Sequence, residues 1–316
     1  MTTITQTVTL KSQCHFGHKV PPGPFGTILR EIPAAVGQSI RMAFEGRSSV
    51  KGKKPHWLTA AADIRFVGYG GDDDTVMYFE APRLGEAAEV LYRQQEMPFM
   101  TRPSPDDTGF DLLGDVLGDL GAENTDSERF DRPLLRQLRR FSDALSEAFN
   151  ELQVAGHRFT QRSPATLNRN VIETARRFVS ETPLPQRVRV AGNLDMIRAS
   201  TQAFALKLEN GEEVRGVLLG GDIGTLTGMF QQEVLVLGKA IYRASGRLLR
   251  IDAEEVSPAS EQDRYFSAVP RPVRKTFDLR QVLREQEHKK GLSAIFGKWP
   301  GNETDEQIQE ALKELS

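Results

Sequence analysis

The stretch from residue 204 to residue 219, FALKLENGEEVRGVLL, decides the fold of this chain. Phe204, Leu206 and Leu208 alternate with small or charged residues, which is the period of a strand with one buried face. Asn210-Gly211 follows at once, and this pair is the strongest short-range hairpin signal because both positions of the favoured turn need positive φ. The stretch therefore predicts two antiparallel strands, at 204–208 and 212–219.

Three further strands are expected around this hairpin. They fall at 187–190, 233–243 and 247–256, with a short helix inside 222–230 before the fourth strand. Glycines at 192, 216 and 238 are typical of bulges and tight bends in a closing sheet. Five short strands with an inserted turn between the third and the fourth resemble an OB-fold. Residues 186–257 are thus expected to form a small, OB-like, five-stranded β-barrel.

The rest of the chain predicts an α+β protein with four parts. Residues 1–101 have the pattern of a mixed α/β unit: an opening strand, a Pro- and Gly-rich loop at 15–26, a helix at 32–44, a hairpin at 62–81 and a helix at 84–95. Residues 133–270 contain a helical middle, with helices at 133–152 and from 164 towards 179, and then the β-module. Residues 271–316 predict a basic helix followed by a helical docking tail.

Residues 102–132 change in composition to Pro, Gly, Asp and Ser, which is typical of a linker and places a domain boundary there. Within them an amphipathic helix is expected, with leucines and a valine on one face and aspartates on another. The apolar residues are Leu112, Leu113, Val116, Leu117 and Leu120, and the acidic ones are Asp111, Asp115 and Asp119. Two alternatives stay open: a helix packed on the body, or a detachable helix for a partner.

Composition narrows the class of protein. The chain has 316 residues, of which 39% are hydrophobic and 27% charged, as in ordinary globular proteins. Its apolar runs are far shorter than the roughly 18 residues of a membrane span, and its first residues lack the pattern of a signal peptide. Cys14 is the one cysteine, so no intrachain disulfide can form. We expect a cytoplasmic protein without membrane contact.

No recognisable catalytic motif occurs in the sequence, and no cofactor is expected. Cys14, His15 and His18 are residue types that zinc prefers, but their spacing matches no closed site, even with His56 added. The acidic run at 72–74 lies at a predicted hairpin turn, where solvated aspartates are common. The sequence therefore predicts no metal site. An enzyme with an unrecognised site stays an alternative.

Nucleic-acid binding is a second alternative, because residues 187–250 contain nine Lys and Arg against six Asp and Glu. Single-strand binders of the OB type add stacking aromatics to a basic groove. The aromatics available within that span are Phe204, Phe230 and Tyr242. A basic loop at 47–57 adds positive charge and a tryptophan. The candidate residues are Arg47, Lys51, Lys53, Lys54 and Trp57 in the loop, and Arg187, Arg189, Lys207 and Arg215 on the barrel.

The C-terminal tail supports the leading interpretation. Its segment FGKWPGNETDE, residues 296–306, resembles the ends of small antitoxin-type proteins that pair with PIN-domain ribonucleases. The resemblance implies a protein partner, of which a PIN-domain ribonuclease is one candidate. The candidate partner-binding residues are Phe296, Trp299, Ile308, Leu312 and Leu315. We therefore expect a non-catalytic bacterial binding or regulatory protein that contacts a partner through this tail, in an antitoxin-like or defence-associated role.

Overall fold

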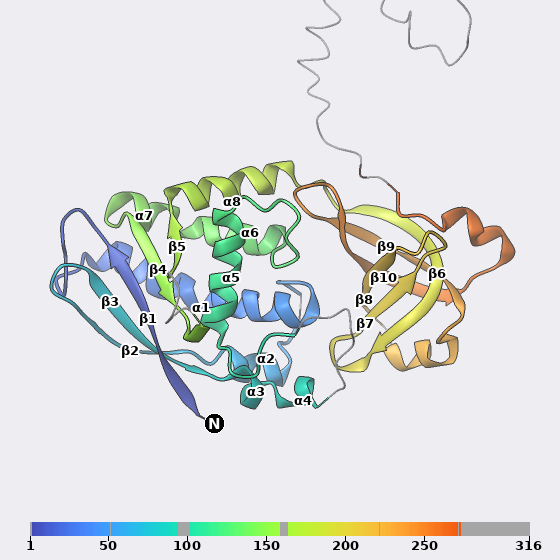
Figure 1. The fold of residues 1–316 in the computed structure, drawn as a ribbon, viewed down its shortest axis with the longest axis horizontal. Helices are drawn as coiled ribbons and strands as arrows, with labels where there is room; N and C mark the ends of the chain where they lie inside the picture. Colours follow the sequence, from blue (N-terminus) through green and yellow to red (C-terminus); the bar gives the residue numbers. More distant parts are fainter. Residues whose placement is uncertain are drawn as a thin grey trace, which may run out of the picture. The chain divides into compact units, whose positions relative to one another are not determined.

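The computed structural model describes residues 2–50, 52–93, 102–158, 164–220, 222–270 and 272. The chain divides into two units, Met1–Pro272 and Val273–Ser316. The expected basic helix and docking tail therefore lie almost wholly outside the described residues. Everything below belongs to the first unit, which combines helices and strands in a mixed α+β fold (Figure 1).

One antiparallel sheet of five strands has the order β2-β3-β1-β4-β5. Its strands are β1 (Thr3–Lys11), β2 (Arg65–Gly70), β3 (Thr75–Pro82), β4 (Glu151–Ala155) and β5 (Ala165–Asn168). The predicted opening strand is its centre, with Val8 and Leu10 buried. The predicted hairpin is confirmed as β2 and β3. Strand β5 was missed, because the sequence favoured a helix directly after residue 164. That helix begins four residues after β5 starts, behind the N-cap Asn168.

Helix α1 (Pro22–Glu45) begins ten residues before the predicted helix at 32–44. The prediction of a loop up to residue 26 was wrong because prolines are tolerated in the first turn, where backbone N–H groups have no helical acceptor anyway. Pro33 lies inside the helix. Every fourth residue from Ile28 onward faces the core, and Gly46 ends the helix in the left-handed conformation.

Seven further α-helices lie within the described residues. They are α2 (His56–Ala61), α3 (Leu84–Ala87), α4 (Glu89–Tyr92), α5 (Gly109–Gly121), α6 (Arg132–Leu138), α7 (Ser142–Glu147) and α8 (Arg169–Glu181). The expected helix at 84–95 breaks at Ala88, and the expected helix at 133–152 divides into α6, a 3-10 turn, α7 and the start of β4.

Helix α5 is the helix predicted within the acidic segment. It packs on the body, which was one of the two alternatives; the other was a detachable helix for a partner. Thr108 and Asp111 form a capping box at its start. Phe110, Leu113 and Leu117 are buried in the same hydrophobic core as α1 and the sheet, and α5 contacts α1, β4 and β5. Residues 102–132 thus share the body's core, and the division of the chain falls after Pro272 instead.

The predicted β-module is a closed barrel of five strands, with the order β10-β8-β7-β6-β9 and β9 paired with β10 (Figure 1). The strands are β6 (Gln186–Arg198), β7 (Ala203–Lys207), β8 (Glu213–Leu218), β9 (Glu233–Tyr242) and β10 (Leu248–Pro258). All pairs are antiparallel except β8 with β10. The inserted turn between the third and fourth strands is a 3-10 helix, Ile223–Met229.

The hairpin at Asn210-Gly211 is confirmed, although its turn differs from the expected type. Gly211 has φ +81°, while Asn210 is not among the residues with positive φ. The Gly211 N–H donates to the Leu208 carbonyl at 2.9 Å, and the Leu208 N–H donates to the Glu212 carbonyl at 2.9 Å. This is a three-residue loop with one left-handed glycine, the next most common hairpin connection after the two-residue turns.

Candidate functional site

A cleft of about 610 Å³ lies where α1 and α5 face the barrel strands β7, β8 and β10. We call it the arginine cleft, after the side chains that line it. These are Arg102, Arg129, Arg158, Arg198, Arg215, Arg243 and Arg250. Its volume falls in the range of about 300 to 1,000 Å³ that is typical of small-molecule sites. Apolar side chains from both sides, including Met42, Val116 and Val217, complete its walls.

Five of these arginines form ion pairs with carboxylates of the described residues. Ion pairs with guanidinium groups are strongest when they are enclosed and share hydrogen bonds. The closest pairs are Arg129 with Asp119 at 2.9 Å, Arg158 with Asp107 at 2.8 Å, Arg215 with Glu128 at 2.7 Å, Arg243 with Glu128 at 2.6 Å and Arg250 with Asp252 at 2.7 Å. These charges hold the cleft walls in place.

The acidic segment after α5 docks onto the basic side of the barrel. Glu128 bridges Arg215 on β8 and Arg243 just after β9. Arg243 also donates to the Asp126 carbonyl at 2.8 Å, and the Ser245 N–H donates to the Thr125 carbonyl at 3.1 Å. The excess of positive charge on the barrel, which favoured the nucleic-acid alternative, is thus partly neutralised by Glu128 of the same chain.

Arg198 differs from those five arginines. It ends strand β6, opposite Ala203 on β7. Its Nη2 atom is enclosed and has no hydrogen-bond partner, and no ion pair joins it to any described residue. Burial lowers the pKa of Arg198, and the positive charge of Arg102 lowers it further. Arg198 and Arg102 both line this cleft.

Tyr92 and Asp107 position the segment that carries Arg102. The Tyr92 hydroxyl donates to the carbonyls of Pro103 at 3.2 Å and Ser104 at 3.4 Å. The Ser104 N–H donates to Asp107 Oδ2 at 2.9 Å. Burial raises the pKa of Asp107, which the nearby charge of Arg158 opposes. A carboxyl group with a shifted pKa in a cleft is a feature the enzyme alternative requires. Asp107 Oδ1 lies 2.8 Å from Nε of Arg158 but accepts no hydrogen bond from any described residue.

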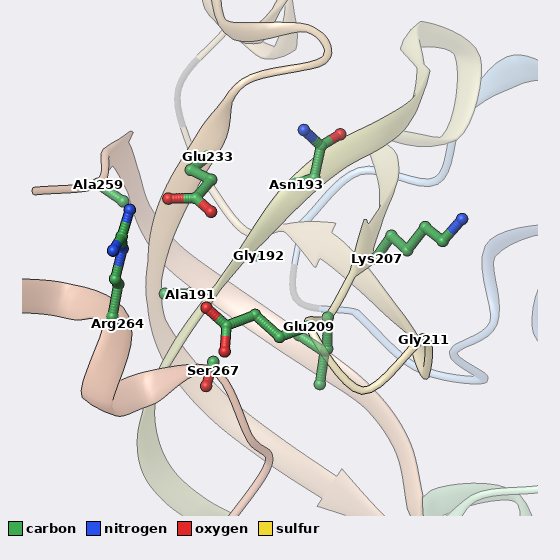
Figure 2. A pocket seen from close by; sticks show the side chains of 11 residues that line it. Ala191, Gly192, Asn193, Lys207, Glu209, Gly211, Glu233, Ala259, Arg264 and Ser267 are labelled. Atoms are coloured by element: carbon green, nitrogen blue, oxygen red, sulfur yellow. The ribbon is translucent and has the colours of Figure 1, made fainter. Parts of the chain in front are cut away.

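The predicted barrel residues do not come together. Arg215 lines the arginine cleft. Arg187 is exposed and pairs with Glu254 at 2.8 Å, while Arg189 lies over the Phe266 ring at 5.8 Å. Lys207 lines a smaller hollow of about 250 Å³, where Figure 2 shows its side chain pointing away from the other charged residues.

The basic loop at 47–57 is divided between the core and the surface. Arg47 is buried, and its Nε donates to Glu45 at 2.9 Å. Trp57 is 8% exposed and packs edge-on against Phe44, with ring centroids 5.6 Å apart. Neither side chain has a free face for a phosphate or a base. Lys53 and Lys54 are exposed, and Lys51 lies outside the described residues.

The Cys and His residues that were considered and rejected as a zinc site lie at the surface. Cys14, His15 and His18 are exposed on the loop between β1 and α1. Within the described part of the chain, no cluster of three or more His, Cys, Asp or Glu is placed to hold a metal ion. In the same part, no helix is long and apolar enough to cross a membrane.

Sequence reasoning missed the central residues of the arginine cleft. Arg198 was counted only as one of nine positive charges. Nothing in its sequence neighbours marks it, because Arg102, which lines the same cleft, is distant in the sequence.

The partner-binding candidates Phe296, Trp299, Ile308, Leu312 and Leu315 lie outside the described residues. No protein-family model, no curated protein and no solved structure matches the chain.

Proposed function

We propose that the protein is a non-catalytic bacterial binding protein that contacts a partner protein through its C-terminal residues. The observation that supports this is that the β-barrel is complete before residue 273, where the tail begins. All five barrel strands lie within residues 186–258, and they pair in a closed ring. The other sheet is formed within residues 3–168. The barrel thus closes with strands from the described residues alone, which is compatible with a role for residues 273–316 in contacting another molecule.

The finer features of the proposal rest on the sequence. We assign the barrel to an OB-like type because its order, with one parallel pair between its third and fifth strands, agrees with the pattern of five strands and one inserted turn. The single exposed cysteine is compatible with a cytoplasmic protein. The tail sequence with Phe296 and Trp299 favours a partner of the PIN-domain ribonuclease class, in an antitoxin-like or defence-associated role.

The test uses the full chain with Phe296 and Trp299 both changed to Ser. Large aromatic side chains dominate interface energies, so this pair should abolish capture of a purified PIN-domain ribonuclease from the same organism. Lys298→Ala, which changes one of the two residues between them, is the matched control. Unchanged melting of the double variant would show that the body is intact. Equal capture by the double variant and the parent chain would remove the proposal.

Nucleic-acid binding by the barrel is the second candidate, and one observation favours it. Tyr265 is 91% exposed, and its neighbour Phe266 lies beside Arg189. Exposed aromatic side chains and cations are the groups that single strands contact, and here the exposed ring and the cation lie at neighbouring residues rather than on one another. Of the aromatics counted from sequence, by contrast, Phe204 and Tyr242 are buried in the barrel core.

This candidate is tested by fluorescence anisotropy with a labelled single-stranded oligonucleotide at low and moderate salt. Binding should weaken steeply with salt and should also weaken in Tyr265→Ala and Arg189→Gln. Arg176→Gln, on α8, supplies a control of the same charge change. Absence of binding at low salt would exclude this candidate and leave the partner-protein proposal unaffected.

A further inference from the structure

We propose that two copies of this chain associate through strand β2, which pairs antiparallel with the β2 strand of the second copy and joins the two sheets into one. The proposal is independent of the C-terminal tail. Strand β2 forms one edge of the five-stranded sheet, with β3 as its neighbour among the described strands (Figure 1). The backbone N–H and C=O groups on the outer side of an edge strand are a template for pairing with another strand.

The two edges of the sheet differ in how they are protected. The other edge strand, β5, has four residues and packs against α5. Strand β2 has six residues, RFVGYG, with no proline or lysine and with Arg65 as its one charge. Phe66, Val67 and Tyr69 are 43%, 61% and 43% exposed. Proteins protect edge strands with charges, with proline or by keeping them short, so the exposed apolar residues of β2 indicate a surface that another strand covers.

A bulge in β2 places its two aromatic side chains on the same face. Phe66 pairs with Phe79 and Tyr69 pairs with Met77, with a register shift between residues 66 and 68. Both partners are buried. Phe66 and Tyr69 therefore face the core side of the sheet, whereas the alternation of an unbulged strand would put them on opposite faces. Phe25 of α1 packs on Tyr69, with ring centroids 5.0 Å apart. The exposed parts of both rings thus lie at the open edge.

The order of residues in β2 favours a second copy as the occupant of this edge. In an interface with two-fold symmetry the same patch occurs on both molecules, so its residues must pair reciprocally. With the two-fold axis between Val67 and Gly68, Phe66 of each copy lies opposite Tyr69 of the other. Both rings are on the same face, and aromatic cross-strand pairs stabilise antiparallel sheets. The strand is therefore complementary to itself.

The charges near β2 favour the antiparallel arrangement. Arg65 of one copy would lie opposite Gly70 of the other, so the two arginines are at opposite ends of the interface. Arg65 lies 2.9 Å from Asp63, and this neutral pair would approach the acidic turn at residues 72–74 of the second copy without net repulsion. A parallel pairing in register would instead place the two arginines side by side, which is destabilising.

The experiment is sedimentation equilibrium of the full chain. A strand of six residues covers less surface than the roughly 800 Å² that each partner gives to a standard interface, so the association is expected to be weak. The average mass should rise from monomer towards dimer as the concentration increases from about 1 to about 200 μM. Val67→Lys, which places two lysines beside the two-fold axis, should weaken association at least about tenfold.

Val90→Lys is the matched control, because Val90 is 53% exposed on α4 and undergoes the same change away from the edge. It should associate as the parent does. Both variants should melt as the parent does, since the side chains of Val67 and Val90 are mostly in solvent. An average mass that is independent of concentration, or equal association of Val67→Lys and the parent, would overturn the proposal.

Disulfide cross-linking tests the register. In a Cys14→Ser background, which removes the native thiol, Phe66→Cys is mixed with Tyr69→Cys under mild oxidation. Directly opposite residues have Cβ atoms about 4.5 to 5.5 Å apart, close to the separation that a disulfide spans. The mixture should form covalent dimers severalfold faster than Phe66→Cys mixed with Val90→Cys, which measures random collisions. Equal rates for the two mixtures would exclude the proposed pairing.

Discussion

The guanidinium group of Arg250 lies 3.4 Å from Oδ2 of Asp131, and both side chains are almost wholly enclosed. Arg250 belongs to β10 of the barrel, whereas Asp131 caps the start of α6 in the helical part. Arg250 also donates to the Gly46 carbonyl at 2.8 Å, and the Ser48 N–H donates to Asp131 at 3.1 Å. This buried polar cluster fastens the barrel to the end of α1.

Replacing Arg250 with Met should therefore be strongly destabilising. Removal of one partner leaves the Asp131 carboxylate enclosed without its counter-charge, and such changes cost about 3 to 5 kcal/mol. The free energy of unfolding from urea titration measures this cost. Arg176→Met, which breaks an exposed pair with Glu173, should change it by less than about 1 kcal/mol. Equal effects of the two changes would mean that the cluster does not join the two parts.

Replacing Gly216 with Ala should also destabilise the protein, through packing inside the barrel. A Cβ atom at residue 216 would lie 2.1 Å from Cζ of Phe204, whose ring is fully buried. Overpacking of this kind costs about 1 to 3 kcal/mol. Gly220→Ala is the control because nothing lies within 4 Å of its Cβ position. Thermal unfolding should separate the two variants by several degrees; coincident curves would contradict the packing argument.

The barrel could be predicted because its signals are local. Alternating residues, the glycine of the Asn210-Gly211 turn and the spacing of the strands all act within short stretches of chain. Of the three glycines expected at bulges or bends, Gly238 pairs with Ala253 beside a register shift, and a Cβ atom there would meet the Asp252 carbonyl oxygen at 2.4 Å. The turn type was the part that failed, since one extra residue joins the loop and Gly211 alone takes the left-handed conformation.

The role of the acidic segment and of the basic loop could not be predicted, because composition does not show which side chains the folded chain encloses. Composition alone marked residues 102–132 as a linker, yet Glu128 meets arginines 87 and 115 positions away. Arg47 and Trp57 had the composition of a solvated loop, yet they are enclosed by Glu45 and Phe44 just before them in the chain. The pattern of charges in a sequence does not show whether a charged side chain faces solvent or forms an ion pair within the same folded chain.

Replacing Tyr92 with Phe should loosen the segment that carries Arg102. The hydroxyl group donates to two carbonyls of that segment, and the loss of such bonds costs about 1 kcal/mol. The ring itself should stay in place, since it packs on Phe44 with centroids 5.8 Å apart. We expect a loss of about 1 kcal/mol in the free energy of unfolding measured by urea titration. Tyr265→Phe, at an exposed position, should leave this free energy unchanged, and equal stability of Tyr92→Phe and the parent would show that these hydrogen bonds do not hold the segment.

The pH dependence of stability should reveal the buried carboxyl group of Asp107. Burial raises its pKa in the folded protein above the ordinary value of 3.8. Between 3.8 and the raised pKa the folded state binds more protons than the unfolded state, so the free energy of unfolding falls as the pH rises. The contribution is fully present below the unfolded pKa and is lost as the pH passes the folded pKa.

Asp107→Asn removes this titration. The difference in unfolding free energy, variant minus parent, should therefore increase between about pH 4 and about pH 7, whatever its absolute sign. Asp263→Asn is the control, because hydrogen bonds from Ser260 lower the pKa of Asp263 and confine its titration to more acidic solution; its difference should stay constant over the same range. Urea titrations at several pH values measure both differences. Parallel curves for Asp107→Asn and the parent would show that Asp107 is ionised throughout, with Arg158 outweighing the effect of burial.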